Sequence, residues 1–225
     1  MVTMRQTPAA AASAKKALII IGGTDALMIF GIGLIWRLTG SFTMGGVSIA
    51  LNGALPCIAY TSLAIASFAK AGAVPFHSWL PDVAEHGPAS VTAYLPASLD
   101  KLLGIYLLAR ISLNLFVMNG ISNTMLLVVG AITIIFAVAI ALVQHDFKRL
   151  LGYHAVSQVG YMILGIGTAN PVGIAGGLFH MLNNALYKSC LFLGAGAVEK
   201  RTGTSDLSDL GGLSKYMRCA PASRT

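Results

Sequence analysis

Six long apolar runs account for most of this 225-residue sequence. Each is close to the roughly 20 residues that an α-helix needs to cross a hydrocarbon layer about 30 Å thick. The runs cover 17–36, about 47–74, about 91–115, about 121–143, about 150–169 and about 172–198. The sequence therefore predicts an all-α fold, a polytopic transmembrane helical bundle of about six spans in a lipid bilayer.

The composition supports a membrane protein and argues against several other classes. Hydrophobic residues make up 56% of the chain and charged residues 10%, with a mean hydropathy of +0.75. The formal charge of +7 does not indicate nucleic-acid binding, because no basic stretch is interleaved with exposed aromatic residues. Cys57, Cys190 and Cys219 are isolated, so neither an iron-sulfur cluster nor a disulfide framework is expected. No cofactor, nucleophile or metal motif is visible, so we expect no cofactor.

Basic residues gather on one side of the predicted bundle. With six spans both termini lie on one face, and that face holds most of the lysines and arginines, whereas Arg37 and Arg110 lie opposite. The basic residues of this face are Arg5, Lys15, Lys16, Lys148, Arg149, Lys200, Arg201, Lys215, Arg218 and Arg224. The positive-inside rule then predicts cytoplasmic termini in a cell inner membrane or plasma membrane. We divide the chain into a cytoplasmic segment 1–16, a transmembrane domain 17–198 and a cytoplasmic tail 199–225.

Four ionisable residues lie inside or beside the first three runs. They are Asp25 in the first run, Lys70 near the end of the second, and Asp100 and Lys101 beyond Pro96 in the third. A charged side chain at the centre of a membrane helix costs roughly 2.5 to 3.5 kcal/mol, so these residues need compensation. An ion or proton path is the leading explanation. Asp25 is either capped near the headgroups or paired with a buried lysine on a neighbouring helix.

Two prolines interrupt these runs. Pro56 lies in the second run and Pro96 in the third. Proline frees a carbonyl from the helical ladder, so a bend or break is predicted near Asp100 and Lys101.

The fifth and sixth runs are polar for membrane spans. In the sixth run, His180, Asn184 and Lys188 stand at i, i+4 and i+8, so they share one helix face over about 12 Å. Water molecules between them would complete a proton relay, although Asn184 cannot titrate. The fifth run carries His154, Ser157, Gln158 and Tyr161. The alternative is that Lys70 and Lys101 extend to the interface and that His180 is a hydrogen-bonded core histidine.

Two charged regions lie between the runs. We expect the residues after the second run to order a turn, with Trp79 at the membrane interface; they are His77, Trp79, Asp82, Glu85 and His86. We interpret Lys148 and Arg149 as cytoplasmic anchors, with a proton entry rim as the alternative.

Four motifs together resemble a known family. They read KAGAVPFHSWLPD, YLPASLDKLLGIYLLAR, QHDFKRLLGYHAVSQVGYM and HMLNNALYKSCLFLGAGAVEKRTGTSDLSDLGGLSKYM. In this order they resemble the antiporter-like proton-translocating subunits of respiratory complex I, Mrp-type sodium/proton antiporters and energy-converting hydrogenases. The resemblance implies a subunit that relays protons, alongside other membrane subunits and redox subunits that carry any oxidoreductase chemistry.

The resemblance also implies roles for individual residues. Lys70 is similar to the lysine on the family's broken seventh helix, and Asp25 to an acid near it on the sixth. Lys101 is similar to the next basic group of the relay, with Asp100 beside it. His180 and Lys188 match the histidine and lysine of the eleventh helix.

The resemblance covers only part of the family's length. The sequence starts before the sixth helix of the family and stops before the twelfth, so we expect a fragment or a chain completed by a partner. A non-catalytic proton-channel subunit of NADH:quinone oxidoreductase or a hydrogenase is the main functional prediction. A self-contained Na+/H+ antiporter subunit and an inactive structural fragment are the alternatives.

Overall fold

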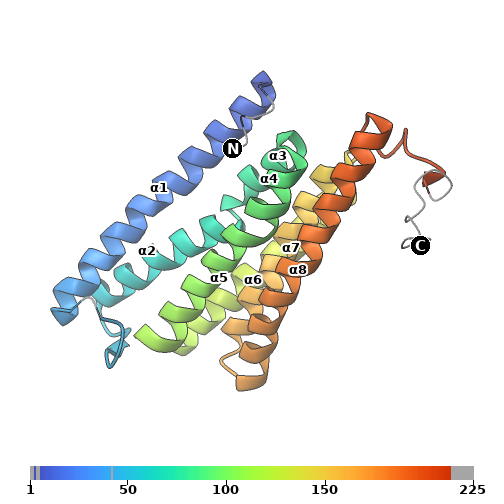
Figure 1. Cartoon of the computed structure of the whole chain (residues 1–225). Coiled ribbons are helices and arrows are strands. Elements are labelled where there is room, and N and C mark those ends of the chain that lie inside the picture. The colour runs from blue at the N-terminus through green and yellow to red at the C-terminus, as the bar shows by residue number, and fades with distance from the viewer. Residues whose placement is uncertain (1–2, 4–5, 42, 214–225) are drawn as a thin grey trace, which may run out of the picture.

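Long helices lie side by side in the computed structural model, which describes residues 3, 6–41 and 43–213 (Figure 1). Helix α1 (Pro8–Thr39) lies at one edge of the bundle and α8 (Pro171–Thr202) at the other. Between them lie α2 (Ala54–Ala71), α5 (Asp100–Arg110), α6 (Gly120–Ala141) and α7 (Phe147–Gly167). The shorter helical elements are η2 (Phe76–Ser78), α3 (Trp79–His86), α4 (Ala89–Tyr94), η3 (Leu95–Leu99) and η4 (Ile111–Leu115). The predicted all-α class is confirmed.

Two short strands close one end of the bundle. Strands β1 (Ile49–Ala50) and β2 (Phe116–Val117) pair in parallel, with Ile49 opposite Phe116. They tie the loop before α2 to the segment that follows α5 and η4.

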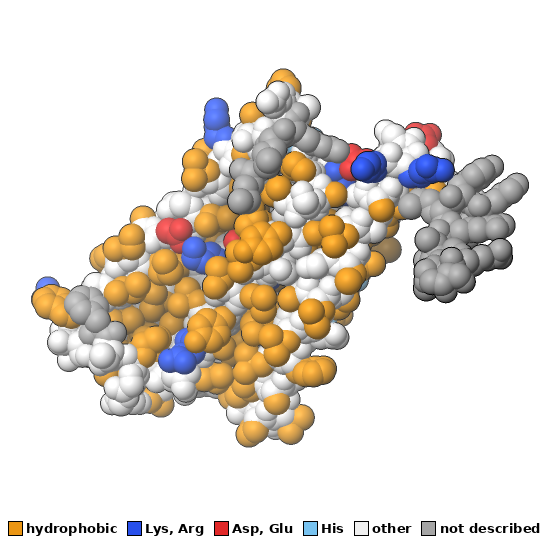
Figure 2. All heavy atoms as spheres, in the orientation of Figure 1, with side chains coloured by type: hydrophobic (Ala, Val, Ile, Leu, Met, Phe, Trp, Pro, Cys, Tyr) orange, Lys and Arg blue, Asp and Glu red, His pale blue; other side chains and the backbone are white. Residues whose placement is uncertain are grey.

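Four stretches of the described chain are long and apolar enough to cross a membrane. They are Pro8–Thr39, Ala54–His86, Ala89–Leu115 and Gly120–Ala141. Helices α7 and α8, with 21 and 32 residues, are long enough but more polar. The protein is therefore a multi-pass membrane protein, and the predicted number of about six spans is approximate. Hydrophobic side chains cover much of the face in Figure 2.

Both prolines of the second and third spans take positions that the backbone tolerates. Pro56 is the third residue of α2, where no helical hydrogen bond needs its missing N–H. The expected interruption of the second span at Pro56 is therefore absent. Pro96 lies in η3, a π-helical turn that joins α4 to α5. The predicted irregularity before Asp100 is thus a π-helical turn, a device that often marks functional sites.

The second span breaks after Lys70 and continues as a separate short helix. Gly72 ends α2 with φ +81°, which favours glycine, and α3 then packs between α1 and α7. Trp79 in α3 donates from Nε1 to the free Ala69 carbonyl at 3.0 Å and is 2% exposed. A turn does follow the second run, within residues 72–75, whereas the segment from Phe76 to His86 is helical. The prediction of an interfacial Trp79 is wrong, because the indole is buried at the break.

Small residues let the main helices approach closely. A Cβ at Gly104 of α5 would lie 2.5 Å from the Ala71 nitrogen and 2.8 Å from the Ser67 carbonyl oxygen. Gly165 of α7 faces Gly177 of α8 in a similar way. Membrane helices often associate through such small residues. These contacts set the depth at which α5, α7 and α8 present their polar side chains.

Candidate functional site

Asp25 and Lys70 form an ion pair between α1 and α2. Lys70 Nζ lies 2.7 Å from Asp25 Oδ1, and the two side chains are 23% exposed for Lys70 and 37% exposed for Asp25. Lys70 occupies the last turn of α2, where the negative end of the helix dipole favours a cation. Of the two alternatives for Asp25, the structure shows the pair with a lysine on a neighbouring helix.

Asp100 and Lys101 begin α5 directly after the π-helical turn. Lys101 is 2% exposed, and its Nζ has no hydrogen-bond partner among the described residues. Asp100 is half-buried and lies within electrostatic range of both Lys70 and Lys101. Lys101 does not extend to the interface, so for this residue the interfacial alternative is wrong.

Lys188 of α8 is fully buried against α7. Its Nζ lies 2.5 Å from His154 Nδ1 and 3.4 Å from the Leu151 carbonyl oxygen. Lys188 is also within electrostatic range of Lys101. The two buried lysines of α5 and α8 therefore face a common region, and His154 borders it from α7.

His180 belongs to a hydrogen-bonded network that crosses from α8 to α7. His180 Nε2 and Gln158 Oε1 are 2.8 Å apart, and the Tyr187 hydroxyl donates to the same Gln158 oxygen at 3.0 Å. Asn184, which is 1% exposed, donates from Nδ2 to the Tyr187 oxygen at 2.8 Å. The α8 residues at i, i+4 and i+8 are thus connected through polar side chains of α7, which the spacing alone does not show.

Charged residues outside the predicted relay join the helix ends at one side of the bundle. Lys148 of α7 is 1% exposed and lies 3.1 Å from Glu199 of α8. Arg149 lies 2.8 Å from Glu85 of α3. Nearby, Lys16 of α1 donates to Asp82 at 2.7 Å. Lys148 therefore lies at this end of the bundle as a buried cation, because α8 covers it and supplies its carboxylate partner.

The predicted residues form two groups and one neighbouring network. Asp25, Lys70 and Asp100 lie around α2, whereas Lys101 and Lys188 lie between α5 and α8. His154 was not among the predicted relay residues, although the sequence showed that its run is polar. Only the packing of α7 on α8 brings His154 to Lys188. Among the described residues, no group of three histidine, cysteine, aspartate or glutamate side chains could hold a metal ion.

Comparison with known proteins places this arrangement in a family. The family model described as NADH:quinone oxidoreductase/Mrp antiporter, transmembrane, matches residues 1–223. The chain belongs to this family. The predicted resemblance is therefore confirmed over nearly the whole sequence.

Individual relatives of this antiporter-like family come from several complexes. The chain is 36% identical over 195 residues to a Na(+)/H(+) antiporter subunit from Alkalihalophilus pseudofirmus, covering 84% of this chain and 39% of the relative. It is 32% identical over 247 aligned positions to an F(420)H(2) dehydrogenase subunit from Methanosarcina mazei, covering 98% of this chain and 36% of the relative.

A solved structure shows the same fold. The structure of the Mrp complex from Dietzia sp. DQ12-45-1b contains a chain that matches with a TM-score of 0.88 and 28% identity. The match covers 93% of this chain and 39% of that one. The chain thus spans about two fifths of the length of the relatives that it matches.

Proposed function

We propose that this chain is the proton-relaying part of an antiporter-like subunit in a redox-driven membrane complex. One observation carries the proposal: Lys101 and Lys188 are buried at membrane depth within electrostatic range of each other, and Lys188 contacts His154. Buried lysines without a carboxylate contact are expensive in a membrane and usually mark ion or proton paths.

Lys70 is the proposed switch of the relay. A nearby carboxylate favours the protonated form of a lysine, and desolvation favours the neutral form. Asp25 now lies 2.7 Å from Lys70, and Asp100 lies within electrostatic range. Movement of either carboxylate would therefore drive uptake or release of a proton at Lys70.

The relay continues from α2 towards α8. A proton from Lys70 passes by way of Asp100 and Lys101 to Lys188 and His154, with water molecules bridging the gaps. The network of Gln158 and Tyr187 then leads to His180. Asn184 does not titrate and orients the Tyr187 hydroxyl.

Partners supply the energy and any redox chemistry. The names of the relatives describe an antiporter subunit and a dehydrogenase subunit, so other membrane and redox subunits are the proposed partners. The chain itself is a non-catalytic part of the translocase and binds no cofactor in this proposal. The 1–16, 17–198 and 199–225 division stays a proposal, with Arg5 and residues 214–225 outside the described part of the structure.

Both termini are proposed to be cytoplasmic in a plasma membrane or cell inner membrane. The support is the cluster of basic side chains where α1 begins, α7 begins and α8 ends. Among the described basic residues assigned to this face, Lys16, Lys148 and Arg149 join these helix ends through ion pairs. The positive-inside rule assigns that side to the cytoplasm.

The decisive variant is Lys70→Met in the intact complex. We expect proton translocation to be lost while assembly and the redox reaction of the partner subunits remain, because methionine keeps the volume but carries no proton. Lys200→Met is the matched control, since Lys200 is exposed in the last turn of α8. Unchanged proton translocation in Lys70→Met would refute the role of Lys70.

Sodium/proton exchange is the second candidate, favoured by the antiporter subunit that is 36% identical. It predicts sodium-dependent proton flux in vesicles that contain this chain alone. A purely structural role, the third candidate, predicts no proton flux in vesicles that contain this chain alone and unchanged translocation by the intact Lys70→Met complex.

A further inference from the structure

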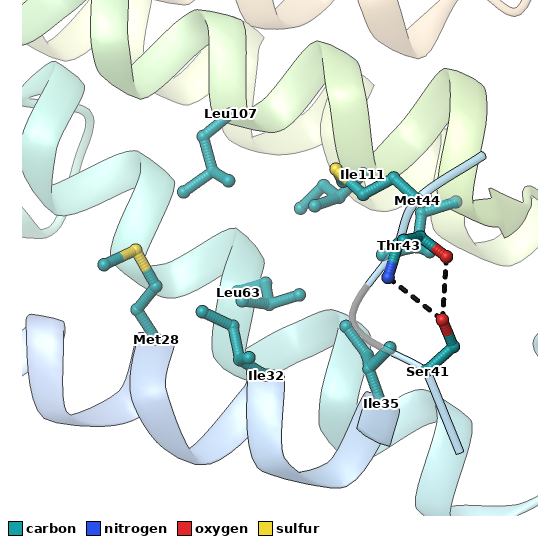
Figure 3. Close-up of a pocket in the computed structure, with 10 residues that line it drawn as sticks. Met28, Ile32, Ile35, Ser41, Thr43, Met44, Leu63, Leu107 and Ile111 are labelled. Atoms are coloured by element: carbon teal, nitrogen blue, oxygen red, sulfur yellow. Dashed lines mark hydrogen bonds between the residues drawn. The ribbon is translucent and has the colours of Figure 1, made fainter. Parts of the chain in front are cut away.

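An apolar groove runs between α1 and α5, with α2 as its floor (Figure 3). It contains a cavity of about 220 Å³ and an adjoining cavity of about 340 Å³, which share Met28, Met44 and Leu107. The first cavity is apolar apart from Ser41 and Thr43. The second reaches Lys70 and Arg110. We call these two cavities the α1–α5 groove.

Arg110 carries the uncompensated charge of the groove. Lys70 is paired with Asp25, but no carboxylate in the described chain lies within ion-pair distance of Arg110. Its Nε has no hydrogen-bond partner among the described residues, and its guanidinium lies 5.9 Å from the centre of the Tyr106 ring. Residues 26–81 and 101–145 contain no aspartate or glutamate. Asp25 of α1 and Asp100 of α5 are therefore the acids of the three groove helices, and neither lies within ion-pair distance of Arg110.

Lys70 and Arg110 lie at different levels along the groove. Gly104 of α5 packs against Ala71, the residue after Lys70. Arg110 follows Gly104 by six residues, which corresponds to about 9 Å along the helix axis. The two cations are thus about 9 Å apart in depth, with Arg110 nearer the end that carries β1 and β2.

The charges in the groove decide between a lipid and a protein as its occupant. The side chains of Asp25 and Lys70 are 37% and 23% exposed. Unless another molecule covers the groove, these exposed parts face the hydrocarbon of the membrane. An acyl chain cannot hydrogen-bond to this pair, and a lipid phosphate at the headgroup level can meet Arg110 but does not reach the pair about 9 Å further along the groove. A membrane helix can cover the pair and also carry an acid at the level of Arg110, where an arginine and a carboxylate form two parallel hydrogen bonds.

We propose that a transmembrane helix from outside this chain occupies the α1–α5 groove and places one aspartate or glutamate against Arg110. The acid lies about 9 Å from the level of Lys70, towards the end with β1 and β2. This contact is a docking contact and does not depend on proton transfer. The apolar walls of the groove, Met28, Ile32, Leu63 and Leu107 among them, receive the side chains of the docked helix.

A photo-crosslink in the intact complex tests this docking contact. Leu103 is 51% exposed and lines the second cavity, so p-benzoylphenylalanine at this position reports what covers the groove. After illumination of native membranes, we expect a peptide adduct that maps to a membrane-spanning segment with an acid at the level of Arg110. Arg110→Ala should lower its yield about tenfold, and Arg110→Glu combined with acid→Arg in the mapped helix should restore it.

Arg37→Ala is the matched control, because Arg37 lies at the same end in the last turn of α1 and lines neither cavity. Its adduct yield should equal that of the parent. A lipid adduct, an adduct with a second copy of this chain, a helix without an acid at that level, or a yield insensitive to Arg110→Ala would overturn the proposal. The crosslink is read out as an adduct and not as proton transport. The docking proposal can therefore fail while the proposed function stands, and the reverse.

Discussion

Gly104→Ala tests whether the close contact between α2 and α5 holds the buried lysines in place. The new Cβ would lie 2.5 Å from the Ala71 nitrogen and 2.8 Å from the Ser67 carbonyl oxygen. These are backbone atoms, so they cannot rotate away and the two helices must move apart. The Ser67 hydroxyl, which donates to the Gly104 carbonyl at 2.6 Å, then loses its bond.

The size of the effect follows from three contributions. Overpacking costs about 1 to 3 kcal/mol. A hydrogen bond between membrane helices contributes about 0.6 kcal/mol on average. Alanine favours a helix over glycine by about 1 kcal/mol, which offsets part of the loss. Gly33→Ala is the matched control because nothing lies within 4 Å of its new Cβ, so it shows only the propensity gain. Gly104→Ala should therefore be about 2 to 4 kcal/mol less stable than Gly33→Ala.

The assay is reversible unfolding of the purified protein in mixed micelles with increasing sodium dodecyl sulfate. Every variant carries Trp36→Phe as well, so that the fluorescence comes from the buried Trp79 and reports the loss of packing around α3. If Gly104→Ala and Gly33→Ala unfold at the same detergent fraction, the close α2–α5 contact is refuted.

The remaining predictions concern the break, the ionic end and the loop after α8. Trp79→Phe should lose about 1 kcal/mol of unfolding free energy, because it removes the donor to the Ala69 carbonyl; equal stability would contradict that role. Lys148→Met should lose about 2 kcal/mol by removing the buried cation beside Glu199, and Lys148→Met/Glu199→Gln should recover at least half; no recovery would contradict an ion-pair origin. Hydrogen bonds from the Ser208 hydroxyl and backbone N–H lower the pKa of Asp206. The hydrogen bonds from Ser208 to the Asp206 carboxylate should therefore persist from pH 7 to pH 5. They should weaken only as the pH falls below about 3.9 and through the lowered pKa of Asp206, which NMR of the Ser208 amide would follow. Loss of these hydrogen bonds above pH 5 would contradict the prediction.

Much of the fold followed from the sequence because a membrane imposes strict lengths and penalties. Apolar runs of about 20 residues predicted the helices. The cost of charge in hydrocarbon drew attention to Lys101, and the helical spacing of polar residues in the sixth run drew attention to Lys188. Both are indeed buried. The partner of Asp25 was also among the alternatives, because a paired charge costs less than a single one.

The errors came from contacts between segments that are distant in the sequence. Helical periodicity placed His180, Asn184 and Lys188 on one face, but it could not show that α7 supplies His154 and Gln158 between them. That register depends on the close approach of Gly165 to Gly177. Trp79 was predicted at the membrane interface and Lys148 as a cytoplasmic anchor, because aromatic and basic residues favour those places. The broken second span and the end of α8 bury both side chains.

The most direct test of the account compares two lysines of the same helix. Lys188 is 0% exposed between α8 and α7, whereas Lys200 lies exposed in the last turn of α8. Proton translocation should be measured in vesicles containing the purified intact complex with Lys188→Met or Lys200→Met. We expect Lys188→Met to abolish translocation and Lys200→Met to leave it unchanged. Full translocation in an assembled Lys188→Met complex would contradict a relay through the buried lysines.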